Sequence, residues 1–218
     1  MRKLFILLFA ISVLTNCKNS EKNAVNEPDQ IGLDSKNEKS LKEENETQDD
    51  LKQLTCNFSE PDTSVVGIKI RNVESTLTIL GKNTSLQGDS THVFYSRDKK
   101  QKLGLTVHPG DYRSQVSIFN ISYSDNTTEK HKQINFREFK TEKGIKLGIN
   151  KSEIIKKLGN CYKAKDSTKN SIELNYRIEQ PNDSKTKLLE NNNMPIYYAT
   201  YKLKNDKLEN IEFGFEYP

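Results

Sequence analysis

Hydrophobic and polar residues alternate along much of the last third of the chain. The alternation runs over 172–178, 196–202 and 211–217, with a polar turn at 204–206 between the last two segments. Successive side chains of a strand point to opposite faces of a sheet. The pattern therefore predicts antiparallel strands with one buried face and one face in water. The polar stretch 179–193 interrupts the alternation and is predicted to be irregular.

A different period appears just before these strands, between 150 and 159. Asn150 fits an N-cap, and Glu153 stands where its side chain completes a capping box. Gly159 suits a left-handed position after the last turn. The apolar stripe at helical spacing is formed by Ile154, Ile155 and Leu158. These signals predict one short amphipathic helix and indicate no chemistry.

The stretch 67–81 resembles the stretch 144–159, and their first glycines are 77 residues apart. In the earlier stretch Asn72 is the candidate N-cap and Gly81 the candidate stop. The stripe of this helix is predicted to be Val73, Leu77 and Leu80. The two stretches therefore suggest an internal repeat.

Candidate strands follow each helix, at 92–97, 102–108, 116–123 and 133–140 in the first unit and beginning at 161–165 in the second. A helical stripe has to be buried against the apolar face of a sheet. The predicted fold is therefore α+β, with two tandem repeats at 55–140 and 141–218. Each repeat is a short helix packed on a meandering antiparallel sheet of three to four strands.

The N-terminus predicts export. Arg2 and Lys3 precede an apolar run at 4–14, which is shorter than the roughly 20 residues that span a bilayer. Such a run is typical of a signal peptide. The segment ends in Leu14-Thr15-Asn16-Cys17, which resembles the lipobox of bacterial lipoproteins, although Asn16 replaces the usual small residue. The alternative is a plain secretory signal with an incidental cysteine.

The lipobox resemblance implies that 1–17 is a lipoprotein signal and that Cys17 carries the lipid, including palmitate. The polar segment that follows, 18–54, is predicted to be a disordered charged tether. Its first part, 18–50, holds five lysines against ten acidic residues and no aromatic residue. Such a chain cannot bury enough apolar surface to offset its ordering entropy. We expect a domain tethered to the membrane of the bacterial cell envelope, in the outer membrane.

The distribution of charge argues against nucleic acid as a partner. The whole chain carries a formal +4; without the two basic residues of the signal and the −5 of 18–50, residues 51–218 carry +7. The lysines are spread along the sequence instead of forming a block, so a solvated surface explains them better than nucleic-acid binding. We expect no nucleic acid and a protein partner in the envelope.

Two cysteines remain after Cys17, and exported proteins can form disulfides. Cys56 and Cys161 each stand at the edge of a predicted element. They form either one bridge or two separate buried thiols, and the spacing alone leaves both open.

The second repeat resembles the fold shared by the beta-lactamase inhibitor protein and the outer-membrane assembly lipoproteins of the SmpA/OmlA type. The likeness covers about 144–218 and is poor over 67–140. The matching residues are Gly144, Leu147, Gly148, Ile154, Leu158, Gly159, Tyr201 and Phe213. Proteins with this fold are binding or assembly proteins, so the resemblance implies a non-enzymatic role.

Candidate chemistry is sparse. The sequence contains none of the common nucleophile, phosphate-loop or zinc-protease motifs. His92, His108 and His131 are scattered, whereas a zinc site needs three or four ligands in fixed geometry. The segment 108–111 reads as His-Pro-Gly-Asp, which is typical of a turn. We expect no catalytic residue, no metal site and no cofactor.

The strand at 196–202 offers the best candidates for a binding surface. Tyr198 and Lys202 are predicted to point away from the core, beside Arg177 of the neighbouring strand. Tyrosine and arginine are enriched at energetic centres of protein interfaces. The sequence therefore favours a protein-binding or envelope-assembly module. The alternatives are an envelope hydrolase or carbohydrate-binding protein with an unrecognised site, and a spacer that binds nothing specific.

Overall fold

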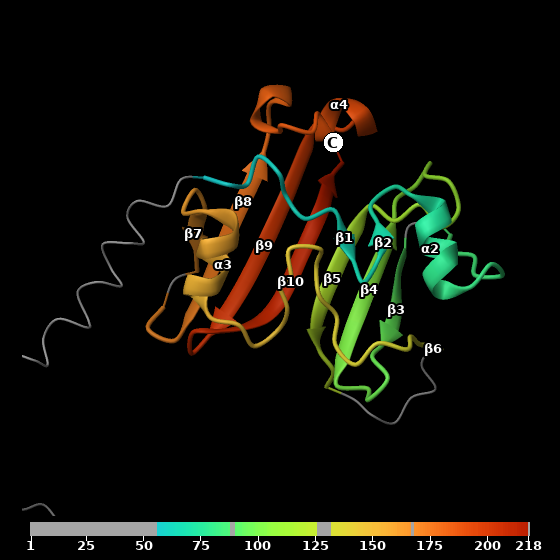
Figure 1. Ribbon diagram of the computed structural model, residues 1–218, viewed down its shortest axis with the longest axis horizontal. Helices are drawn as coiled ribbons and strands as arrows, with labels where there is room; N and C mark the ends of the chain where they lie inside the picture. Colours follow the sequence, from blue (N-terminus) through green and yellow to red (C-terminus); the bar gives the residue numbers. More distant parts are fainter. Residues whose placement is uncertain (1–55, 88–89, 126–131, 167, 218) are drawn as a thin grey trace, which may run out of the picture. The chain divides into compact units, whose positions relative to one another are not determined.

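The computed structural model describes residues 56–87, 90–125, 132–166 and 168–217 (Figure 1). The predicted signal peptide, Cys17 and residues 18–54 of the tether lie outside these ranges. In chain order the elements are β1 (Ser64–Val65), β2 (Ile68–Lys69), α2 (Val73–Leu80), β3 (Ser90–Tyr95), β4 (Gln101–Val107), β5 (Ile118–Tyr123), β6 (Lys132–Gln133), α3 (Lys151–Leu158), β7 (Lys163–Lys165), β8 (Ser171–Ile178), the 3-10 turn η1 (Pro181–Asp183), α4 (Leu188–Asn192), β9 (Ile196–Lys204) and β10 (Lys207–Glu216).

One mixed sheet of eight strands dominates the fold, in the order β6-β3-β4-β5-β10-β9-β8-β7 (Figure 1). Neighbours are antiparallel except β3 and β6. The expectation of a separate sheet for each repeat is wrong. Strands β5 and β10 would be the edges of two smaller sheets, but they pair with each other and place Phe119 opposite Phe213. This pairing satisfies two strand edges that would otherwise be open.

The core lies on one face of the sheet, as the alternation predicts for β8, β9 and β10. Tyr176, Tyr201 and Phe213 are fully buried and belong to one contiguous cluster. The register places inward residues of adjacent strands side by side, so Tyr176 faces Ala199 and Phe213 faces Ala199 from the other side. Small Ala199 leaves room for the rings on both sides of it.

Helix α3 forms as predicted. The Asn150 side chain accepts a hydrogen bond from the Glu153 amide at 2.9 Å, and Glu153 Oε2 accepts one from the Asn150 amide at 3.0 Å. Ile154 and Leu158 are fully buried in the core. Gly159 has φ 82° and ψ 179°, so its conformation is one that glycine tolerates but not the predicted left-handed helical one.

Helix α2 also begins at its predicted cap, because Asn72 Oδ1 accepts from the Ser75 amide at 2.8 Å. Its predicted stripe is wrong in part. Thr76 is the buried residue of this helix, whereas Val73, Leu77 and Leu80 remain partly exposed. The Thr76 hydroxyl donates to the Asn72 carbonyl at 3.1 Å, so it is satisfied without water.

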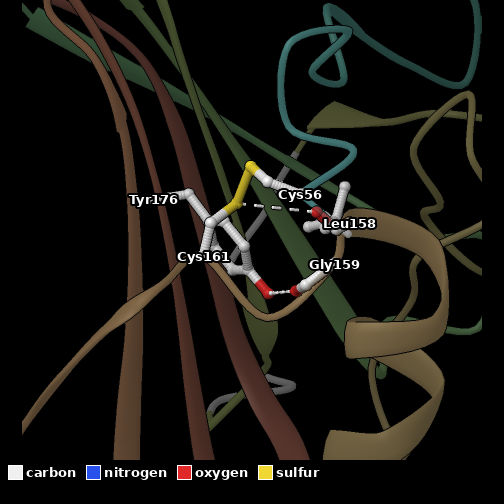
Figure 2. The surroundings of a disulfide bond; sticks show 5 residues. All are labelled: Cys56, Leu158, Gly159, Cys161 and Tyr176. Atoms are coloured by element: carbon white, nitrogen blue, oxygen red, sulfur yellow. Dashed lines mark hydrogen bonds between the residues drawn. A yellow bond between two sulfur atoms is a disulfide. The ribbon is translucent and has the colours of Figure 1, made fainter. Parts of the chain in front are cut away.

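An N-terminal segment, which we call the strap (residues 56–63), crosses the inner face of the sheet toward β1 (Figure 1). It begins at a disulfide between Cys56 and Cys161, whose Cα atoms lie 5.2 Å apart (Figure 2). The Asn57 amide donates to the Leu158 carbonyl at 3.0 Å. Phe58 is buried, with its ring centroid 4.9 Å from that of Tyr176. The strap thus covers the end of α3 and the adjacent core.

Two carboxylates hold the other end of the strap. Asp62 Oδ1 accepts from the Lys143 amide at 2.8 Å, and Glu142 Oε1 accepts from the Thr63 amide at 2.5 Å. Asp62 is 1% exposed, and its Oδ2 has no hydrogen-bond partner among the described residues. Burial raises the pKa of Asp62 to about 6. This group therefore opposes folding when it is ionised.

Sequence patterns missed several short elements. The stretch predicted to be irregular, 179–193, contains η1 and α4, and Leu188 and Leu189 of α4 are buried. The β1–β2 hairpin was not predicted. The predicted strand at 133–140 shrinks to β6, whose two residues pair in parallel with β3. Elements of two to five residues contain too few positions for a period to appear.

Candidate functional site

The outer face of the sheet is the surface on which the predicted binding residues meet. We call it the open face, because in the described part of the chain α3, the buried strap residues and the partly buried residues of α2 pack against the opposite side. The register aligns its side chains in rows across four adjacent strands. Its members are Ile118, Asn120 and Ser122 of β5, Asn210, Glu212, Gly214 and Glu216 of β10, Ile196, Tyr198, Thr200 and Lys202 of β9, and Glu173, Asn175 and Arg177 of β8.

The structure places all three sequence-predicted residues on the open face. Arg177 lies directly opposite Tyr198 in the β8–β9 register, and Lys202 lies opposite Glu173, two rows away. Thr200 and Asn175 form the row between them, joined by a hydrogen bond of 2.9 Å. Side chains two positions apart on one strand share a face, so the three predicted residues stand on one platform.

Tyr198 is held by a carboxylate on the central strand. Its hydroxyl donates to Glu212 Oε1 at 3.1 Å, and Asn120 Nδ2 donates to Glu212 Oε2 at 2.9 Å. Burial, together with the charge of Glu212, raises the pKa of Tyr198, so the phenol stays protonated. The ring points outward as predicted, but it is only partly exposed because it packs beside these polar groups. The hydrogen bond to Glu212 therefore holds the Tyr198 ring in one orientation, from which a partner could contact it.

Arg177 is fixed by two carboxylates. Its Nε donates to Glu179 Oε1 at 2.6 Å and its Nη2 to Glu216 Oε2 at 2.7 Å. The hydrogen bond with Glu179, reinforced by Glu216, raises the pKa of the already basic guanidinium. The side chain is 34% exposed, so these pairs orient the group more than they stabilise the fold.

Lys202 belongs to a second polar group on the same face. Its Nζ lies 3.3 Å from Glu173 Oε2, and Asn175 Nδ2 donates to Glu173 Oε1 at 2.8 Å. Burial of Glu173 opposes its ionisation, but these donors outweigh burial and lower its pKa. The carboxylate is therefore charged and paired. The open face thus carries residues that are already oriented by one another, which is favourable for binding because little side-chain entropy is lost.

The histidines do not converge. His92 Nε2 lies 3.2 Å from the Ser90 hydroxyl, whereas the His108 ring stacks on Tyr217 with centroids 3.8 Å apart. His131 lies outside the described residues. Within the described ranges no group of three or more His, Cys, Asp or Glu side chains could hold a metal ion.

Sequence reasoning missed a buried polar cluster around Asp111. Its Oδ1 accepts from Arg71 Nη1 at 2.9 Å and from the Tyr217 hydroxyl at 2.7 Å, and its Oδ2 accepts from Ser117 Oγ at 2.7 Å. The carboxylate is 4% exposed, and its hydrogen-bond partners among the described residues are all donors. The cluster ties the C-terminal residues to the start of α2 and is structural. The sequence shows that Arg71 and Asp111 have opposite charges, but they are 40 residues apart, so nothing in it indicates that they meet.

No known protein-family model matches the chain, and neither the curated proteins nor the solved structures contain a match. None of the helices in the described ranges is long and apolar enough to cross a membrane.

Proposed function

We propose that this protein is a non-enzymatic lipoprotein of the bacterial cell envelope whose open face binds another envelope protein. The observation that carries the proposal is that Arg177 and Tyr198 lie opposite each other on β8 and β9, with Arg177 held by two carboxylates and Tyr198 by one. Tyrosine and arginine are enriched at the energetic centres of protein interfaces. Glu212 and Glu216 hold these two side chains in fixed positions.

The membrane attachment in this proposal rests on the sequence. Cys17 would carry acyl chains, including palmitate, and each buried methylene contributes about 0.8 kcal/mol to anchoring. The polar segment 18–54 would keep the sheet away from the bilayer, in the outer membrane of the cell. Labelling with a radioactive fatty acid tests this part: label that remains in a Cys17→Ser variant contradicts it.

We also propose that the two halves derive from one duplicated unit of the kind found in the beta-lactamase inhibitor protein and the SmpA/OmlA-type lipoproteins. Two observations support it. Each half contains an eight-residue helix capped by asparagine and followed by glycine. A long strand of each half, β5 in the first and β10 in the second, pairs with the other in the centre of the sheet.

Site-specific cross-linking tests the binding role. A photoreactive amino acid at Lys202 should trap a protein partner in intact cells, and Tyr198→Ala or Arg177→Ala should each weaken capture by about tenfold or more. Tyr112 is 80% exposed and lies in the β4–β5 connection, outside the open face, so Tyr112→Ala is the matched control. Equal capture by all three variants would contradict the proposal. Thermal unfolding of each variant checks that the fold survives.

A further inference from the structure

A cavity lies against the C-terminal end of helix α2 and the residues that follow it. Ile79 and Leu80 remain partly buried and form one wall of this cavity of about 720 Å³. Buried Phe94 of β3 and Ile134, which follows β6, form its apolar floor. We call this space the α2 cavity. Its volume lies within the range of about 300–1,000 Å³ that is usual for sites that bind small molecules.

The charged side chains among the described residues that line the α2 cavity are all positive. Lys82, just after α2, and Lys132 of β6 line it and are exposed to solvent. The other described lining residues beyond Gly81 carry hydroxyl or amide groups, and no acidic side chain is among them. These residues are Asn83, Thr84, Ser85, Gln133 and Asn135. An apolar floor with two ammonium groups complements a ligand that is apolar at one end and negative at the other.

We propose that the α2 cavity binds a small amphiphile with an aliphatic chain and one anionic head group. The chain lies against Phe94, Ile134 and Leu80, and the head group lies near Lys82 and Lys132. Binding removes from water the apolar surface that α2 leaves uncovered, which is the dominant favourable contribution to association of such ligands. The site is in the first half of the chain and does not depend on the open face.

Calorimetric titration of the full-length protein with dodecanoate, below its micelle concentration, tests the proposal. We expect saturable binding of one molecule per chain. Dodecylamine has the same chain and the opposite charge, and we expect it to bind at least about tenfold more weakly. No saturable binding of dodecanoate, or equal binding of both compounds, would overturn the proposal.

Charge-reversal variants locate the site. Lys82→Glu and Lys132→Glu should each weaken dodecanoate binding by about tenfold. Lys163→Glu makes the same change on exposed β7 in the other half of the sheet and should have no effect. Equal loss in all three variants would place the ligand elsewhere and refute the assignment.

A steric variant tests the apolar part independently of charge. Asn135 is exposed and lines the cavity, so Asn135→Trp should fill its mouth and abolish binding without disturbing the core. Amide hydrogen exchange supplies a second readout: dodecanoate should slow exchange in α2 and leave α3 unchanged. Slowing confined to α3, or undiminished binding in Asn135→Trp, would contradict the proposed location.

Discussion

Helices α2 and α3 have nearly the same local sequence signals but very different burial. Both are eight residues long, both are capped by an asparagine and both are followed by a glycine with positive φ. Ile154 and Leu158 of α3 are fully buried, whereas Leu77 and Leu80 of α2 remain partly exposed. Caps therefore determine where a helix begins and ends, and the sheet and strap beside it determine how much apolar surface it buries.

The surroundings of α3 explain the difference. The strap covers its C-terminal end, a disulfide joins the strap to Cys161, and Lys156 and Lys157 lie where cations complement the negative end of the helix dipole. Helix α2 has no basic residue in its last turn, and the α2 cavity lies against its C-terminal end. We expect the second half of the chain to be the more stable half.

Reduction of the Cys56–Cys161 disulfide should have the largest effect. The bridge closes a loop with a sequence separation of 105 residues, and loss of such bridges typically costs about 2–5 kcal/mol. Guanidinium unfolding with and without reductant measures the loss, and amide exchange should rise first in the strap and at the end of α3. A Cys56→Ser/Cys161→Ser variant should not respond to reductant. If amide exchange rose only in α2, the disulfide would stabilise the first half of the chain, contrary to our expectation.

Truncating equivalent leucines compares the two helices directly. Leu158→Ala removes a fully buried side chain and should cost about 3 kcal/mol, because a cavity remains. Leu80→Ala removes a partly exposed side chain and should cost about 1 kcal/mol. Both values come from urea unfolding under oxidising conditions. Equal losses would show that α2 is packed as well as α3.

The Asp62→Asn substitution probes the strap through pH. The pKa of Asp62 is about 6 in the folded protein and 3.8 without burial, so the native state binds more protons between these values. Stability from this group is present below pH 3.8 and is lost as pH rises through about 6, by up to roughly 3 kcal/mol.

Asparagine keeps an oxygen that can accept from the Lys143 amide but carries no charge. The unfolding free energy of Asp62→Asn should therefore rise relative to the natural protein across this pH window and then remain constant above it. Chemical unfolding at a series of pH values provides the measurement. Parallel pH profiles of the two proteins would disprove the role of Asp62.

Removing the helix caps should have the smallest effects. Asn150→Ala breaks a reciprocal capping box and should cost about 1 kcal/mol or slightly more, whereas Asn72→Ala breaks one side-chain cap and should cost about 1 kcal/mol or less. Thermal unfolding measures both. A larger loss for Asn72→Ala would mean that α2 contributes more to the cooperative unit than its burial indicates.

The sequence predicted most of the long strands and both capped helices, because each contains enough residues for its period to be visible. Tyr198, Lys202 and Arg177 were also placed correctly on one face by alternation alone. What alternation could not indicate is that the Tyr198 hydroxyl reaches Glu212 and that Arg177 lies between Glu179 and Glu216. The contacts of Tyr198 with Glu212 and of Arg177 with Glu216 depend on the register between strands, and periodicity in one sequence does not reveal that register.

Local chemistry in the sequence thus determined the elements themselves: Asn72 and Asn150 begin helices because their side chains satisfy free amides, and the alternation that starts at Ile211 lies in β10, which has one apolar side. Only the tertiary structure decided that β5 and β10 join into one sheet, that the strap covers the end of α3, and that a cavity lies against the C-terminal end of α2. Periodicity and capping act within a few residues. Pairing of strand edges and filling of volume depend on residues far apart in the chain.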